Sequence, residues 1–137
     1  PEHLCLISDS GLIAGDMVAG IGTILIPPGQ GDMMTYIEQL ERLLDLDPHL
    51  IFPSHGPVIP LPSRTLEHYI RHRSIRHDKV LAAVEEGNSE LNLIAKIAYQ
   101  DTPDAHPGLA VDQTLSHLLS HEKDGKVMRV DGGWVRT

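Results

Sequence analysis

The sequence has little of several features that would each define a class of protein. It contains a single cysteine, Cys5, so no internal disulfide can form and a reducing compartment is expected. Aromatic residues make up only 4% of the chain, so the core must be built from Leu, Ile, Val and Ala. Basic residues number 11 against 19 acidic ones, and the net charge of −8 disfavours sequence-blind binding to nucleic acid or anionic membranes.

Long hydrophobic runs are also missing. The longest uncharged run, Met17 to Gly31, is shorter than the ~20 residues of a membrane-spanning helix, and two prolines interrupt it. The opening residues, Pro-Glu-His-Leu, do not follow a signal-peptide pattern. We therefore expect a piece of a longer protein that has no membrane contact. It would be cytoplasmic, or belong to another reducing compartment such as the mitochondrial matrix.

The first part of the chain alternates short apolar runs with turn residues. His3–Ser8 and Gly11–Gly15 flank an Asp-Ser turn and predict a β-hairpin, and Thr23–Ile26 predicts a third strand. Helical spacing of Ile and Leu follows from Asp32 up to Pro48, and Leu50–Phe52 predicts one more strand. This order of elements is typical of an α/β protein.

The pattern changes after residue 62. Ser63 is placed to cap a long helix that reaches toward Gly87, and Leu91–Tyr99 and Leu109–Glu122 predict two shorter helices. Val127–Val130 and Trp134–Arg136 flank an Asp-Gly-Gly turn, which indicates a second hairpin. Helices followed by a two-stranded wing are the outline of a winged-helix module.

Asp16 and His55 are the candidate site residues. Each stands where an apolar strand gives way to a turn that contains glycine, a common place for functional side chains. A carboxylate can bridge two divalent cations, and a neutral imidazole is a common zinc ligand. Spacing alone favours the simpler interpretation that both are turn residues.

The segments around these residues carry a family resemblance. HLCLISDSGLIAGD, GTILIPPGQGDM and FPSHGPVI together resemble the second half of a metallo-β-lactamase-superfamily hydrolase. The resemblance implies that Asp16 bridges two metal ions, that His55 binds the second ion, and that His3 lines the site and contacts substrate. The tail AHPGLAVDQTLSHLLSHEKDGKV, followed by Trp134, resembles the winged-helix extension of the branch that includes β-lactamase-like endoribonucleases.

The family motif H-x-H-x-D-H is absent from the chain, and this sets what we expect of it. The expected fold is α/β (α+β): the C-terminal half of a metallo-β-lactamase αββα sandwich followed by a small winged-helix domain. The expected parts are residues 1–62, a linking helix over 63–82, and the winged helix over 83–137. With only two expected ligands, Asp16 and His55, the fragment by itself should not be an active hydrolase.

The resemblance implies a metal-dependent hydrolase with two divalent cations, expected to be zinc, in the intact protein. Its substrate would be a small-molecule ester or thioester, or single-stranded RNA. Duplex DNA is disfavoured, because the tail from residue 83 has five basic residues against nine acidic ones. Alternatives are a winged-helix binding module for nucleic acid or a partner protein, and a structural domain with a decayed site. A homodimer contact through the winged helix stays open.

Other histidines and basic residues have simpler interpretations. His68 with His72 and His117 with His121 are each one helical turn apart, but neither pair has the Glu of H-E-x-x-H, so we expect exposed helix residues. The basic residues of the linking helix should form a solvated face or an interdomain contact; they are Arg71, Arg73, Arg76 and Lys79. Cys5 is expected to be a buried small residue, not a nucleophile.

Overall fold

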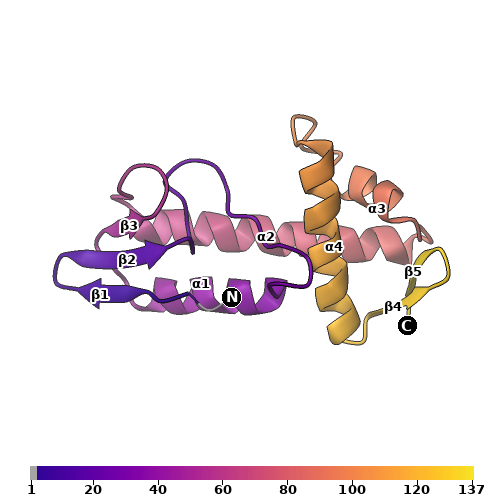
Figure 1. Ribbon diagram of the computed structural model, residues 1–137, viewed down its shortest axis with the longest axis horizontal. Helices are drawn as coiled ribbons and strands as arrows, with labels where there is room; N and C mark the ends of the chain where they lie inside the picture. Colours follow the sequence, from indigo (N-terminus) through magenta and orange to yellow (C-terminus); the bar gives the residue numbers. More distant parts are fainter. Residues whose placement is uncertain (1–2) are drawn as a thin grey trace. The chain divides into compact units, whose positions relative to one another are not determined.

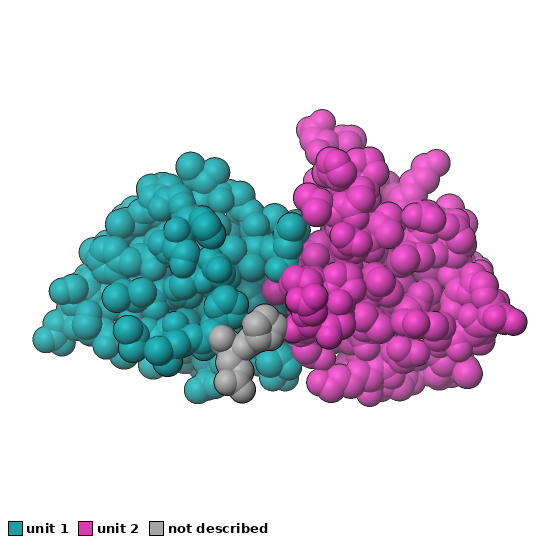
Figure 2. Space-filling view, in the orientation of Figure 1, with its two compact units in different colours: residues 1–25, 35–72 teal, residues 26–34, 73–137 magenta. Residues whose placement is uncertain are grey.

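A computed structural model describes residues 3–137 and divides the chain into two compact units. Unit 1 contains residues 1–25 and 35–72, and unit 2 contains residues 26–34 and 73–137 (Figure 2). Each unit has its own buried residues and is described by itself. The domain boundaries expected from the motifs, at residues 62 and 82, stay a prediction.

Unit 1 is built on a small three-stranded sheet. β1 (Leu6–Ser8) and β2 (Gly11–Gly15) form the predicted antiparallel hairpin, and β3 (Ile51–Pro53) adds to β2 in parallel (Figure 1). Along β2, Leu12 and Ala14 are buried whereas Ile13 between them is exposed. This alternation is expected of a strand with one covered face, because successive side chains point to opposite sides of a sheet.

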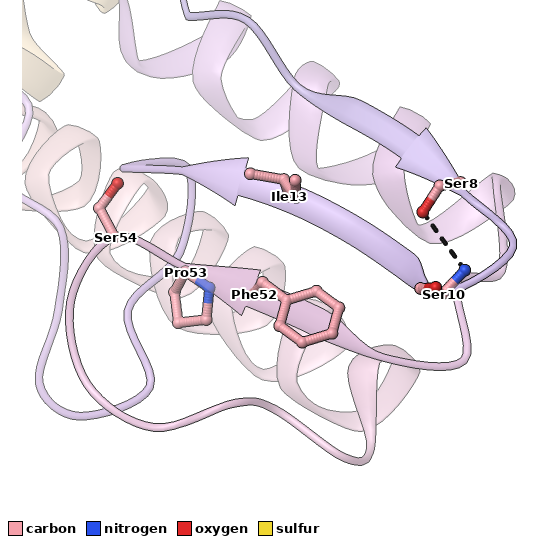
Figure 3. A pocket seen from close by; sticks show the side chains of 6 residues that line it. All are labelled: Ser8, Ser10, Ile13, Phe52, Pro53 and Ser54. Carbon is pink, nitrogen blue, oxygen red and sulfur yellow. Dashed lines mark hydrogen bonds between the residues drawn. The ribbon is translucent and has the colours of Figure 1, made fainter.

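Two helices supply the apolar side chains that complete unit 1. α1 (Met33–Asp45) buries Ile37, Leu40 and Leu43 at helical spacing, and α2 (Pro62–Glu85) buries Leu66 and Tyr69 in its first half. Both helices run behind the sheet in Figure 3, on the side away from Ile13. The helices predicted from Asp32 and from Ser63 are therefore confirmed to within one residue at their starts.

The predicted strand over Thr23–Ile26 is wrong. The segment has no regular secondary structure, and two prolines that lack N–H groups follow it. The backbone of Ile26 bonds to side chains instead: its N–H donates to Gln113 Oε1 at 3.3 Å, and its carbonyl accepts from Ser116 Oγ at 2.6 Å. The side chains of Gln113 and Ser116 thus bind the backbone groups that a neighbouring strand would bind in a sheet.

Unit 2 follows the predicted order of helices and hairpin. The second half of α2 is followed by α3 (Leu91–Ala98), α4 (Pro107–Lys123) and the antiparallel pair β4 (Val127–Val130) and β5 (Gly133–Arg136). Its apolar core contains Val80, Ala83, Val84, Ile94, Ala98, Leu118, Val127 and Trp134. The β4–β5 hairpin is confirmed, while the assignment of these elements as a winged helix stays a prediction.

The expectation that His117 and His121 are exposed is wrong, and two basic residues of α2 are buried as well. His117 and His121 are fully buried, and Arg73 and Arg76 are each only 3% exposed. The two histidines were expected to be exposed, and helical spacing shows which residues share a face but not whether that face is covered. Arg73 and Arg76 were expected in a solvated face or an interdomain contact, and their burial rules out the solvated face. His68 and His72, in contrast, are exposed as expected. None of the helices within residues 3–137 combines the length and apolarity needed to cross a membrane.

Candidate metal centre

Asp16 and His55 meet at one edge of the unit 1 sheet. Asp16 directly follows β2, and His55 lies two residues beyond β3. Because β2 and β3 are parallel neighbours, their carboxyl ends lie at the same edge and bring the two side chains together. His55 Nε2 lies 3.3 Å from Asp16 Oδ1, and both side chains reach solvent.

The loops that carry these residues are joined backbone to backbone. The N–H of Gly20 donates to the carbonyl of His55 at 2.8 Å, and the N–H of Ser54 donates to the carbonyl of Gly15 at 3.0 Å. A Cβ placed on Gly20 would lie 2.2 Å from the carbonyl oxygen of Pro57, so only glycine allows this approach. The spacing between Asp16 and His55 therefore depends on glycine in a loop that carries no reactive group.

Two buried tyrosines anchor the same loop from the helices. The hydroxyl oxygen of Tyr69 in α2 accepts from the N–H of Ala19 at 3.2 Å. The same hydroxyl lies 3.1 Å from the carbonyl oxygen of Gly22, to which it can donate. Tyr36 of α1 donates to the carbonyl of Met17 at 2.8 Å. Sequence reasoning missed both, although a tyrosine on the buried face of a helix signals a hydroxyl that needs a partner.

The donor atoms at this edge suit a divalent cation. Asp16 Oδ1 is buried and has no hydrogen-bond partner within residues 3–137, which is unusual for a carboxylate oxygen. Two ligands at the usual ~2.0–2.1 Å from one tetrahedral zinc are about 3.3 Å apart, close to the distance between Asp16 Oδ1 and His55 Nε2. The described part of the chain holds no group of three or more His, Cys, Asp or Glu placed to bind a metal ion. Asp16 and His55 are thus the two candidate ligands at this edge.

His3 lies beside this edge and is exposed. A Cβ added to Gly15 would lie 3.9 Å from His3 Nδ1, so the imidazole neighbours the residue that precedes Asp16. Its expected contact with substrate stays a prediction. Cys5, half-buried on the adjacent segment, has a pKa raised by burial, which keeps the thiol protonated and agrees with a packing role.

A shallow hollow extends over the sheet face opposite the helices. Ser8, Ser10, Ile13, Phe52, Pro53 and Ser54 line it (Figure 3). Ile13 and Phe52 point from neighbouring strands onto this face, and Ser54 at one end directly precedes His55. The hollow is therefore continuous with the loop that carries His55.

Comparisons with known proteins give β-lactamase-like relatives in sequence and a metallo-β-lactamase fold in structure. The chain is 35% identical over 130 residues to the "Beta-lactamase-like protein 2 homolog" of Drosophila melanogaster, covering 92% of the chain and 43% of that protein. It is 29% identical over 150 residues to the "Lactamase-like protein nscB" of Aspergillus fumigatus, covering 92% of the chain and 43% of that protein. No protein-family model matches the chain.

Solved structures agree on the fold. A β-lactamase domain protein from Burkholderia ambifaria matches with a TM-score of 0.76 at 23% identity, over 92% of this chain and 41% of that one. A metallo-β-lactamase family protein from Thermus thermophilus matches with a TM-score of 0.71 at 19% identity, over 92% and 42% respectively. The chain spans less than half the length of each of these proteins. The chain is thus similar in sequence to β-lactamase-like proteins over 92% of its length, and it has the fold of metallo-β-lactamase family structures.

Proposed function

We propose that this chain supplies part of the metal centre of a hydrolase, with Asp16 and His55 as ligands of divalent cations, expected to be zinc. The observation that carries the proposal is the buried Asp16 Oδ1, which makes no hydrogen bond within residues 3–137 and lies 3.3 Å from His55 Nε2. A carboxylate oxygen left without a hydrogen bond is costly unless a cation or proton occupies its lone pairs.

The residues of the chain have distinct tasks in this proposal. Asp16 presents two oxygens, so it can contact two cations at once, whereas His55 offers one nitrogen to one cation. A cation held there would polarise a carbonyl or phosphoryl oxygen and lower the pKa of water. The Gly20 and Ser54 backbone bonds keep the two ligands at one spacing. An ester, a thioester or a phosphodiester of single-stranded RNA would be cleaved.

Two ligands are too few for firm binding, because a closed zinc site takes about four. We therefore expect this chain to bind zinc weakly and to be inactive by itself. The remaining ligands would come from the portion of the related proteins that this chain does not match. Activity is thus a property proposed for a protein that contains both portions.

The first test is a zinc titration of the chain by calorimetry. His68 and His72 form a stacked pair on α2 that can itself bind zinc, so the reference protein carries His68→Ala and His72→Ala. In that background, weak binding is expected to persist and to be lost on adding Asp16→Ala or His55→Ala. His49→Ala, which removes another exposed histidine, is the matched control. Binding that survives both site substitutions would overturn the assignment.

The second test uses a longer protein that also contains the portion missing here. Asp16→Ala and His55→Ala should each lower hydrolysis by orders of magnitude, since about 1.4 kcal/mol of lost transition-state stabilisation is already tenfold in rate. His68→Ala should leave the rate unchanged. Metal content is measured in the same samples, and near-normal activity and metal content in the Asp16 variant would contradict the proposal.

A nucleic-acid-reading winged helix is the weaker candidate. In α4 the polar residues Gln113, Ser116 and His117 are buried within unit 2, so they are not free to contact bases. The exposed positions of the helix include the acidic Asp112. A recognition helix normally presents basic residues to the groove.

A further inference from the structure

α4 crosses the second half of α2 inside unit 2 (Figure 1), and three buried histidines of these two helices contact one another. His77 of α2 is 6% exposed, and His117 and His121 of α4 are 0% exposed. The His77 ring stacks on His121 with centroids 3.6 Å apart and lies 5.3 Å from the His117 ring. The proposed metal centre uses none of them, so this cluster requires its own explanation.

The hydrogen bonds of the cluster fit neutral imidazoles. His121 Nε2 lies 3.0 Å from the carbonyl oxygen of His77, and because a carbonyl only accepts, this nitrogen must carry the hydrogen. His77 Nδ1 and His117 Nδ1 are 3.1 Å apart, so one donates and the other must keep its lone pair. If both carried a hydrogen, the two N–H groups would point at each other.

The remaining ring nitrogens have no acceptor among the described residues for a further N–H, and one of them, Nε2 of whichever of His77 and His117 accepts the Nδ1 hydrogen bond, already carries the hydrogen of its neutral ring. His77 Nε2, His117 Nε2 and His121 Nδ1 are buried, and no atom of residues 3–137 is a hydrogen-bond partner for them. A protonated ring would therefore hold a positive charge that neither water nor an acceptor can stabilise. The closed arrangement is built for three uncharged rings.

The charges around the cluster do not compensate for this burial. Burial lowers the pKa of His117 most, and the charges of His77, Arg73, His121 and Arg76 lower it further; both buried guanidinium groups lie on the same stretch of α2. The other charged groups that act on the cluster are Asp78 on α2, Asp32 before α1, and Asp124 and Lys126 after α4. Asp32 and Asp124 are ion-paired to Lys123 and Lys126, which weakens their attraction for a proton on the rings.

The pKa values of all three histidines are lowered. Burial is the largest cause, and with the charges of His121 and Lys126 it lowers the pKa of His77 to about 4. Burial also lowers the pKa of His121, although its bond to the His77 carbonyl acts in the opposite direction. Groups whose pKa is lower in the folded state take up protons when the structure opens, so acid favours the opened form.

We infer that His77, His117 and His121 form an acid-sensitive latch that holds α4 on α2 only while all three rings are neutral. Opening would also free the segment before α1, because Gln113 and Ser116 of the same helix bind the backbone of Ile26. Protonation of a ring in this cluster would thereby release α4 both from α2 and from the backbone of Ile26.

The test is hydrogen exchange of the α4 backbone amides, measured by NMR at about pH 7.5 and about pH 5.5 and corrected for the intrinsic exchange rate. A histidine with a pKa of 6.5 when open and about 4 when closed raises the opening constant about tenfold over this interval. Protonation of His77 alone should raise the opening constant about tenfold between the two pH values, and protonation of all three rings should raise it at most about a thousandfold. Fluorescence of Trp134, which lies in the core of unit 2, follows the same opening.

Substitutions that keep the hydrogen-bonding atom but cannot be protonated separate this effect from simple packing. His117→Asn retains a group near the Nδ1 position, and His121→Gln retains a donor near Nε2. Each variant should lose up to tenfold of the pH dependence of the opening constant. The matched control is His68→Gln with His72→Gln on the exposed face of α2, where the pH dependence should stay that of the unsubstituted chain.

A second measurement on the unsubstituted chain avoids any variant that fails to fold. The ¹⁵N chemical shifts of the three buried rings should report neutral imidazoles in the folded chain at about pH 5.5. An opening constant that does not change between the two pH values, or a ring of the cluster that is protonated in the folded chain, would overturn the latch.

Discussion

At the scale of single residues, Gly20 sets the distance between the two proposed ligands. A Cβ at this position would lie 2.2 Å from the carbonyl oxygen of Pro57, a backbone atom that cannot move without its loop. We expect Gly20→Ala to cost about 1–3 kcal/mol of unfolding free energy and to weaken zinc binding, because Asp16 and His55 are pushed apart. Urea unfolding and calorimetric zinc titration check the two effects.

Gly108 in the first turn of α4 is the control for this substitution. A Cβ there would meet His106 at 3.4 Å, an ordinary contact with a side chain, and alanine favours helix. Gly108→Ala should therefore leave zinc binding unchanged and stability unchanged or higher. If Gly20→Ala behaves in the same way, the close approach of the two loops does not position the ligands.

Asp101 is the second residue with a defined electrostatic role. Its oxygens accept from Lys79 Nζ at 2.6 Å and from Arg76 Nη1 at 2.9 Å, and these two bonds hold the pKa of the carboxyl well below its usual range. The buried Arg76 guanidinium also donates to the carbonyl of Ala98 and lies over the Tyr99 ring at 4.0 Å. Asp101 thus supplies the negative charge nearest to a buried positive one.

We expect Asp101→Asn to lower the unfolding free energy at neutral pH by about 1 kcal/mol, a value reduced for the half-exposed carboxylate. Since the folded pKa is lowered, the contribution is present above the unfolded pKa of ~3.9 and is lost as the pH falls below it. Urea unfolding at neutral pH and at about pH 3 should show the difference shrinking. Asp104→Asn, in the same loop, should change nothing at either pH.

The candidate site shows which residues a sequence can reveal. Asp16 and His55 could be found because each ends an apolar strand, and parallel neighbours place such residues at one edge. Tyr69 and Gly20 could not be assigned in the same way, because their roles depend on which loop packs against which helix. Local pattern therefore located Asp16 and His55, the family resemblance implied their role as ligands, and neither revealed the residues that position them.

At the scale of elements, α4 has a polar face that is buried. Gln113 connects three partners: its Oε1 accepts from the Ile26 N–H and from Arg73 Nη1 at 3.0 Å, and its Nε2 donates to the Ile26 carbonyl at 3.0 Å. Gln113→Ala would remove the acceptor of the buried Ile26 N–H and one acceptor of Arg73, while the Ile26 carbonyl keeps its bond from Ser116, and a buried donor left unsatisfied costs about 1–3 kcal/mol. We expect a loss of about 2 kcal/mol, measured by urea unfolding with Trp134 fluorescence.

Asp112→Ala is the matched control for Gln113→Ala, because it removes the neighbouring polar side chain on the exposed face of the same helix. It should change the unfolding free energy by no more than about 0.5 kcal/mol. Equal effects of the two substitutions would show that the bonds of Gln113 to Ile26 and Arg73 contribute little to stability.

The buried polar face also explains where prediction of the elements failed. The helices and both hairpins follow from apolar spacing and turn residues, since those signals are local. The absence of a strand at Thr23–Ile26 and the burial of His117 depend on residues about 90 positions apart along the chain, or on two helices meeting. Hydrophobic periodicity carries no information about a helix face whose contacts are polar.

At the scale of the whole molecule, net charge limits the partners of the chain. The value of −8 at pH 7 and the acidic residues on the exposed side of α4 oppose the phosphate backbone of duplex DNA. The charges of α4 that face solvent include Asp112 and Lys123, and Lys123 is ion-paired to Asp32 at 3.1 Å. No counterion release large enough to support tight non-specific binding is expected from such a surface.

We therefore expect no duplex-DNA binding below the micromolar range at physiological salt, measured by mobility shift. Asp112→Lys with Glu122→Lys on α4 reverses two charges and should produce weak binding at low salt that disappears as salt rises, because binding through phosphates is salt-dependent. Sub-micromolar binding by the unsubstituted chain at physiological salt would contradict the charge argument. It would also favour the winged-helix binding module over the hydrolase fragment, because affinity against the net charge requires a specific fit to the bases.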